Sequence, residues 1–374
     1  MALAFLLYVL QWSELYGFRS YTLEIFISMI LFASLGMSYA YQKFFLKNET
    51  ISHQSLDISM HKFILIMSVL WVIFVYEVVD FGGVPLLMTL AGEDFNYQDF
   101  GVSKLHVLFV PYYSAFSIIC FYRMMIYKDK LYLVAILSSV LFSLLAMSRG
   151  TLVINCMGFA FVYLYLTQNM RRAILSVVAL GLCFIFAFGY LGDKRMMSSG
   201  YQSKTAIYDV GKANRNVFNS HMPSGFFWAY LYTSSSFANL ENQIRHDNTN
   251  TSSFYELART SILPDYVSKR IPKSNDEYSV MLITPELIVS TVFGLPIVIM
   301  GYTGILIVFI WYCLLCWGSL RAVRNAYLIP LSAILCSMSG LMLFDNMLVF
   351  GSFFTQILLL LILPLSSKGK YRFI

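Results

Sequence analysis

Ionisable side chains are scarce in this chain, and several of them stand where long apolar runs end. Arg149 and Gly150 form a corner between two such runs in the stretch "LLAMSRGTLVIN". Glu77 and Asp80 lie three residues apart near the end of another run, and His106 lies near the start of the next. An arginine binds anions such as phosphates, whereas carboxylates and imidazoles transfer protons. Together these residue types could serve acid–base chemistry on an anionic substrate.

Each of these charges also has a simpler interpretation. A charged side chain at the end of a membrane helix can extend into the headgroup region and act only as an anchor. Mixed acids and bases at several such ends, to which Glu286 and Asp345 add two carboxylates, instead favour a polar site that opens at a membrane surface. Under this interpretation Arg149 binds the anion.

The composition indicates which elements must position these residues. Of 374 residues, 58% are hydrophobic and only 12% are charged, which is about half the charged share of a typical soluble domain. Continuous apolar runs of about 20 residues predict an all-α polytopic integral membrane protein. The six cysteines lie within apolar runs, so we expect no disulfide framework. The basic residues do not cluster in a tail, which disfavours nucleic acid as a partner.

The apolar runs predict about ten transmembrane helices in a single membrane domain, residues 1–374. Lys and Arg occur in alternate short connections, which places those connections and both termini in the cytoplasm. Two long connections, 81–103 and 192–284, and the Arg149 corner then lie outside. The ten ranges are 2–16, 23–43, 61–80, 104–122, 131–147, 150–167, 172–191, 290–317, 326–344 and 347–366.

The segment 192–284 is the longest polar stretch of the chain. It carries ten Lys and Arg residues and also many aromatic residues, among them Trp228, Tyr230 and Tyr232. A segment with this aromatic content is expected to be ordered and partly helical. Cations bind diphosphates and aromatic rings stack on sugars, so a lipid-linked phosphorylated glycan would suit it as a ligand.

Several segments, taken in order, resemble the bacterial O-antigen or oligosaccharide repeat-unit polymerases of the Wzy type. The stretches "VDFGGVPLLMTL" at 79–90 and "FGVSKLHVL" at 100–108 are similar to the end of that family's third span and the loop after it. The stretch "AMSRGTLV" at 146–153 is similar to the family's Ser-Arg-Gly corner. Its Tyr-rich outer segment resembles "WAYLYTSSSFANLENQI" at 228–244, and its following span, with paired glycines Gly301 and Gly304, resembles "STVFGLPIVIMGYTGIL" at 290–306. We expect those two glycines to let helices approach closely.

The resemblance implies a membrane glycosyltransferase, similar in layout to the polytopic GT-C-like enzymes. Such a polymerase transfers the growing glycan from undecaprenyl diphosphate to a sugar hydroxyl of a new lipid-linked repeat unit. The reaction takes place at the periplasmic face of a Gram-negative inner membrane, in lipopolysaccharide biosynthesis. Membrane lipid and a chain-length regulator protein are the partners that it implies.

Attack by a sugar hydroxyl benefits from a general base, and the candidates are Glu241, His221 and Glu286, with His246 and Asp345 also open. Asn239 gains support from its motif, although it could equally cap a helix. We expect no cofactor and no metal ion, since no Asp-x-Asp occurs in the chain. The candidate substrate-binding residues are Arg149, Arg195, Arg215, Arg245, Arg259, Arg270, Tyr230 and Asn239.

Three other functions remain open. An O-antigen ligase would share the large outer loop with its arginine and histidine residues. A flippase or transporter for a lipid-linked oligosaccharide is a second alternative, although such proteins often have internal repeats and mid-membrane charges. A structural scaffold is a third, for which clustered outer charges would be unnecessary.

Overall fold

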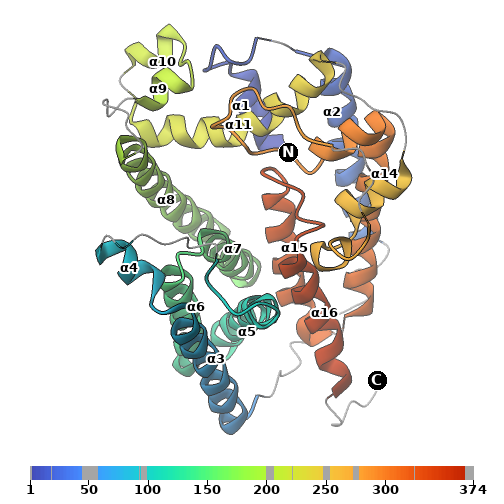
Figure 1. Cartoon of the computed structure of the whole chain (residues 1–374). Coiled ribbons are helices and arrows are strands. Elements are labelled where there is room, and N and C mark those ends of the chain that lie inside the picture. The colour runs from blue at the N-terminus through green and yellow to red at the C-terminus, as the bar shows by residue number, and fades with distance from the viewer. Residues whose placement is uncertain are drawn as a thin grey trace. The chain divides into compact units, whose positions relative to one another are not determined.

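The computed structural model describes residues 2–17, 19–43, 58–91, 93, 99–198, 206–220, 222–246, 253–272, 278–323 and 325–366. These residues form helices and loops without any β-strand, and one isolated antiparallel bridge joins Ser13 to Ala213 (Figure 1). The sequence predicts a single membrane domain, whereas the chain divides into two compact units. Unit 1 combines Met1–Lys47, Arg171–Leu314 and Ser339–Val349, and unit 2 combines Asn48–Met170, Leu315–Met338 and Phe350–Ile374.

Within the described ranges, four helices are long and apolar enough to cross a membrane. They are α2 (Tyr21–Tyr41), α3 (Met60–Phe81), α5 (Leu105–Tyr127) and α14 (Gly294–Ala322). These helices support the expectation of a helical membrane protein. Shorter apolar helices are α6 (Leu133–Leu145), α7 (Arg149–Leu166), α15 (Asn325–Leu341) and α16 (Gly351–Ser366).

A helix occurs in each of the ten ranges expected to span the membrane, but their lengths differ from the expectation. The first, α1 (Ala2–Val9), has only eight residues, whereas about 20 are needed to cross the hydrocarbon core. The seventh, α8 (Met170–Ser198), has 29 residues and so continues into the segment expected to be a loop. Local hydrophobicity therefore places the helices more reliably than it sets their ends.

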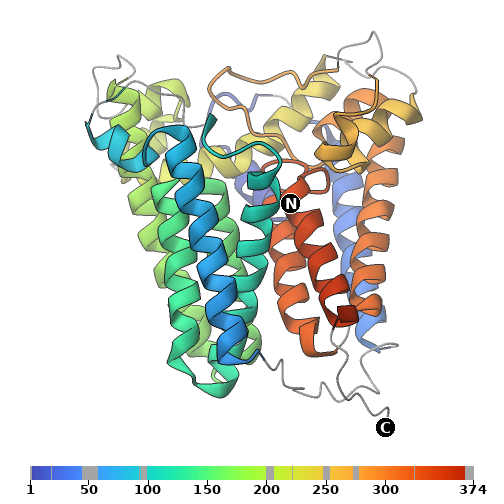
Figure 2. The same cartoon turned by 60° about the horizontal axis from the view of Figure 1, so that its bottom comes forward.

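In unit 2, α5 is the central helix. It packs against α6, α7 and α16 and also contacts α3 (Figure 2). In its most apolar window 67% of the residues are buried, against 28% for α3. Aromatic rings fill the space between these helices, and Phe142 of α6 meets Phe74 of α3 and Phe109 of α5 at centroid distances of 5.0 and 4.9 Å. The polar connection 81–103 includes the short helix α4 (Pro85–Ala91).

Unit 1 is organised around α11 (Ser224–Arg245), which belongs to the long polar segment. This helix packs against α1 from the other end of the chain (Figure 1), and Phe5 and Tyr8 of α1 place their rings within 5.5 and 5.0 Å of Phe237. Most of α11 is buried, including its serine run. The remaining helices of this segment are α9 (Ala206–Val210), α10 (Arg215–Asn219), α12 (Phe254–Leu257), the π-helical turn η4 (Ala258–Ile262) and α13 (Asp265–Ser268).

Two glycines set how closely α8 approaches α11. A Cβ atom on Gly189 would lie 2.3 Å from the Cα atom of Gly225, so only a side chain of a single hydrogen fits at this crossing. One turn further along α8, Asp193 accepts hydrogen bonds from the Trp228 indole, at 2.8 Å, and from the Ser224 hydroxyl, at 2.5 Å. The helix α11 is thereby held at its N-terminal end.

The other glycine pair, Gly301 and Gly304, acts differently from the expectation. Gly301 has φ +60°, and together with Met300 it breaks the helical path of α14. A Cβ atom on Gly304 would lie 2.2 Å from the carbonyl oxygen of Pro296, which precedes the kink in the same element. The pair therefore permits α14 to bend sharply, and the expected contact is with the helix's own first turn rather than with a neighbouring helix.

Candidate functional site

A polar cavity of about 230 Å³ lies in unit 1, between α11 and the N-terminal part of the chain. One wall is the C-terminal half of α11, the second is α1 with the turn that follows it, and the third is the segment 281–289. The lining residues are Tyr8, Leu15, Tyr16, Ala238, Glu241, Asn242, Arg245, His246, Leu282 and Ile283.

Glu241 is the buried acid of this cavity. The residue is only 1% exposed. Its Oε2 atom accepts a 2.7 Å hydrogen bond from the backbone N–H of Ser20. Its Oε1 has no hydrogen-bond partner among the described residues. Burial raises the pKa of the Glu241 carboxyl from 4.5 to about 8, against the opposing effect of the Ser20 N–H. A carboxyl of this kind exchanges a proton close to neutral pH.

Two charged residues at the start of α2 affect the pKa of Glu241. Ser20 caps the helix by accepting from the backbone N–H of Leu23, and the Arg19 guanidinium forms two hydrogen bonds, of 2.7 and 2.9 Å, to the Glu24 carboxylate. Glu24 contributes to raising the pKa of Glu241, whereas Arg19 lowers it. The two members of this ion pair therefore oppose each other in their effect on the pKa of Glu241, which is raised mainly by burial.

Tyrosine side chains fix the N-terminal turn against α11. The Tyr16 hydroxyl lies 2.8 Å from the Ser234 hydroxyl, and the Tyr230 hydroxyl accepts a 2.9 Å hydrogen bond from the backbone N–H of Trp12. Tyr230 was expected to bind substrate, but its buried hydroxyl holds the turn instead. Tyr8 and Tyr16 also border the cavity, although both are as buried as Tyr230.

The segment 281–289 is held along α11 by side-chain amides. Asn239 donates from Nδ2 to the carbonyls of Leu287 and Val289, and its Oδ1 accepts from the N–H of Ile283, each at 2.8 Å. Gln243, one turn further on, exchanges hydrogen bonds with both backbone groups of Met281. The amide of Asn239 is thus committed to the backbone, and it is a positioning residue rather than a substrate ligand.

Two cationic or titratable groups border the same cavity beyond Glu241. Arg245 lies one helical turn after it on α11, and His246 is the C-cap residue of the helix. Both residues are exposed and both line the cavity. Arg245 is therefore the arginine of the expected substrate-binding set that the structure brings beside the buried acid.

The other expected residues lie elsewhere. His221 lies outside the described residues. For Arg149 and Arg195 the structure gives the backbone only, in the first turn of α7 and near the end of α8. Arg259 forms a 2.7 Å ion pair with the fully buried Glu256. Exposed side chains that do not line the cavity are those of Arg215, Arg270 and Glu286.

The sequence predicts no role for the residues around Arg19. Tyr8 and Tyr16 fall in the range 2–16, which is expected to span the membrane, and Arg19 follows that range. A signal was present: Arg19 and Glu24 bracket Ser20, a favoured N-cap residue, at the start of an apolar run. The distance of more than 200 positions to Glu241 carries no such signal.

Unit 2 contains a separate charged pair. Glu77, fully buried near the end of α3, has its carboxylate oxygens 3.0 and 3.1 Å from Nδ1 of His106 in the first turn of α5. Asp80, one turn later, is exposed. Of the acids and bases expected to gather at span ends, Glu77 and His106 are thus in direct contact.

Comparison with known proteins gives no assignment: no family model matches the chain, and neither does any curated protein or solved structure. Within the described ranges, no group of three or more His, Cys, Asp or Glu side chains is placed to hold a metal ion. The chemistry of the site is therefore inferred from the cavity around Glu241.

Proposed function

We propose that this chain is a membrane glycosyltransferase that polymerises lipid-linked oligosaccharides, of the O-antigen polymerase kind. The observation that carries the proposal is a buried carboxyl whose pKa of about 8 suits a general base, in a cavity bordered by Arg245 and two tyrosines. We further propose a multi-pass location in a bacterial inner membrane, with the cavity at the periplasmic face.

In the proposed reaction, deprotonated Glu241 accepts the proton of a sugar hydroxyl on the incoming repeat unit. The hydroxyl oxygen forms a bond to the anomeric carbon of the growing glycan while the bond from that carbon to the carrier's diphosphate breaks. The electron pair leaves with the diphosphate. Arg245, on the next turn of the same helix, is placed to offset that negative charge.

The tyrosines and the segment 281–289 have supporting roles in this proposal. Tyr8 and Tyr16 form the floor of the cavity that a sugar would enter, and Leu282 and Ile283 form an apolar wall beside them. Because Asn239 and Gln243 fix that wall to the helix that carries Glu241, the wall and the base keep a constant separation. Such preorganisation reduces the entropy lost when a glycan binds.

A second candidate function, transport of a lipid-linked oligosaccharide, is favoured by one observation. Glu77 is buried in a helix long enough to cross a membrane and contacts His106, and ionisable pairs at membrane depth commonly carry protons in transporters. A transporter would depend on this pair and would tolerate the loss of Glu241. A ligase, in contrast, would share the dependence on Glu241.

The proposal is tested by the lipopolysaccharide pattern of a deletion strain that is complemented with variants. A polymerase predicts that the deletion leaves lipid A core capped with a single repeat unit, and that Glu241→Gln does not restore the ladder. Glu14→Gln, which changes an exposed glutamate of the same unit, should restore it fully. Complete loss of repeat units in the deletion strain would instead indicate a ligase or a transporter.

Glu286 provides the comparison between candidate bases. It is exposed and belongs to the wall segment 281–289 without lining the cavity, so Glu286→Gln should retain polymer if Glu241 is the base. A ladder lost with Glu286→Gln and retained with Glu241→Gln, at equal abundance in the membrane, would transfer the catalytic role to Glu286.

A further inference from the structure

Arg123 is buried in unit 2, and two of its three guanidinium nitrogens lack a hydrogen-bond partner among the described residues. The residue is 7% exposed, and within the described part of the chain neither its Nε nor its Nη1 atom has a partner. The guanidinium lies over two tyrosine rings, 5.2 Å from the Tyr127 centroid and 5.0 Å from that of Tyr132. The rings hold the cation in place through cation–π contacts, but they do not accept its N–H groups in the plane of the fork.

No described acid neutralises Arg123. Asp129, the acid that follows α5 in sequence, accepts from the backbone N–H of Leu131, and no ion pair between it and Arg123 occurs among the described residues. Lys128 and Lys130, on either side of Asp129, are both exposed. A buried cation without a counter-charge is strongly unfavourable. A guanidinium with two free donors is suited to a phosphate.

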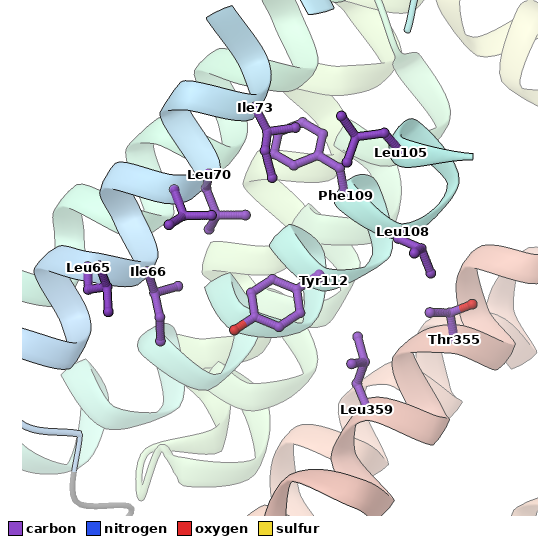
Figure 3. Close-up of a pocket in the computed structure, with 11 residues that line it drawn as sticks. Leu65, Ile66, Leu70, Ile73, Leu105, Leu108, Phe109, Tyr112, Thr355 and Leu359 are labelled. Atoms are coloured by element: carbon purple, nitrogen blue, oxygen red, sulfur yellow. The ribbon is translucent and has the colours of Figure 1, made fainter. Parts of the chain in front are cut away.

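An apolar groove of about 470 Å³ lies in the same unit, between α3, α5 and α16. Figure 3 shows that its walls carry leucine, isoleucine and phenylalanine side chains, with Tyr112 of α5 and Thr355 of α16 as the polar exceptions. Both α3 and α5 are long and apolar enough to cross a membrane. In a bilayer this groove would face hydrocarbon, which suits an acyl chain.

The groove and the guanidinium occupy one face of α5. Tyr112 and Arg123 are eleven residues apart in this helix, which is close to three turns and about 17 Å. Rings connect them without interruption: Tyr112 stacks on Phe116, Phe116 meets Phe63, and Phe63 meets Tyr132 beneath Arg123. One leaflet of a bilayer has a hydrocarbon depth of about 15 Å, so a single lipid molecule matches this spacing.

We propose that unit 2 binds an anionic phospholipid, with the phosphate on Arg123 and an acyl chain in the groove between α3, α5 and α16. The groove favours a lipid over free phosphate, because inorganic phosphate has no apolar part to bury there. It also favours a lipid over a protein carboxylate, which would leave the groove empty. This inference does not depend on the proposed glycosyl transfer.

Native mass spectrometry of the full-length protein, released from nanodiscs of phosphatidylcholine with a minor fraction of phosphatidylglycerol, tests this site. We expect wild type to retain phosphatidylglycerol in preference to phosphatidylcholine, and Arg123→Gln to reduce that retention about tenfold, as expected for the loss of a charge-assisted hydrogen bond. Lys269→Gln removes one positive charge from an exposed site in unit 1 and should leave retention unchanged.

Further variants separate the two halves of the site. Arg123→Lys keeps the charge but not the planar fork, so its retention should be intermediate. Val69→Trp fills the groove at a half-exposed wall position and should lower retention while Arg123 is intact. If Arg123→Gln does not fold, lipid selectivity of wild type together with the Val69→Trp result decides the question.

Four outcomes would overturn the proposal. The first is wild-type protein without any preference for the anionic lipid, and the second is equal retention by the Arg123 and Lys269 variants. A third is thermal stabilisation of the protein by inorganic phosphate alone that equals stabilisation by phosphatidylglycerol, which would assign a free-phosphate site. The fourth is a polypeptide that co-purifies through Arg123 regardless of lipid.

Discussion

Replacing Glu241 with glutamine should change stability and activity in opposite directions at high pH. Between pH 4.5 and about 8 the folded protein holds a proton on this carboxyl that the unfolded chain has lost. The free energy of unfolding of wild type therefore decreases as the pH rises through this window, and the loss is complete above the folded-state pKa. Glutamine, which is neutral at every pH, removes this dependence.

The magnitude follows from the pKa and from the hydrogen bonds of the carboxyl. A pKa that moves from 4.5 to about 8 corresponds to an upper limit of about 5 kcal/mol, at about 1.4 kcal/mol per pKa unit. Glutamine keeps an acceptor for the Ser20 N–H but adds a buried NH₂ group, whose missing partners cost about 1–3 kcal/mol. The net gain at pH 9 is then at most about 2–4 kcal/mol, or roughly 3–5 °C in the unfolding midpoint of a chain of this length.

The assay compares thermal unfolding of wild type, Glu241→Gln and Glu14→Gln in detergent between pH 5 and pH 9. We expect the Glu241 variant to be no more stable than wild type at pH 5, more stable at pH 9, and inactive in polymer formation throughout. Wild-type activity should rise with pH and reach half of its maximum near pH 8, because the base acts when deprotonated. A wild-type midpoint that is flat over this range, or a Glu241 variant less stable at pH 9, would refute the reasoning.

Three further predictions concern neighbouring interactions. Arg19→Gln should move the midpoint of the pH–rate profile upward, because the arginine lowers the pKa of Glu241. Glu24→Gln should move it downward, because the glutamate raises that pKa. Movement of both midpoints in the same direction would contradict the assignment of Glu241 as the base. Asn239→Ala removes three hydrogen bonds to the segment 281–289 and should lower the free energy of unfolding by about 2–4 kcal/mol; a loss below about 1 kcal/mol in chemical denaturation would show that the segment is held by other contacts. His106→Ala leaves the buried carboxylate of α3 without its partner and should lower the free energy of unfolding by about 3–5 kcal/mol, and a double variant that also replaces that acid by glutamine should recover part of it.

The apolar helices could be predicted from the sequence because their signal is local. The runs that form α3 and α5 are uninterrupted, and each is bounded by polar residues within a few positions. The contact between Glu77 and His106 follows almost directly, since one residue ends a helix and the other begins the next. Local reasoning is sufficient wherever neighbouring elements in sequence are also neighbours in space.

The candidate site could be predicted only in part because its walls come from distant segments. The serine, asparagine and glutamate residues of α11 indicate a helix at a surface, yet Ser235, Asn239 and Glu241 are buried. Asn239 and Glu241 tolerate burial chiefly because backbone groups from remote loops supply partners, as Ser20 does for Glu241. A pattern within one helix does not contain that information.

The surroundings of single arginines were the hardest feature to predict from the sequence. Arg245 lies beside the buried acid, whereas Arg259 is neutralised by Glu256 three residues before it. The i, i+3 spacing of that pair is visible in the sequence and could have removed Arg259 from the candidate set. Arg149 and Arg195 stay predictions.

The pairing of α1 with α11 has a consequence for biosynthesis. Trp12 and Tyr230, which share a hydrogen bond, are 218 positions apart. At a translation rate of about 5–20 residues per second, the first helix therefore waits roughly 10–40 s for its partner to emerge from the ribosome. During that interval its aromatic residues need another host, either the insertion machinery or lipid. A fragment that begins after residue 47 should consequently fail to assemble the cavity, however well its own helices form.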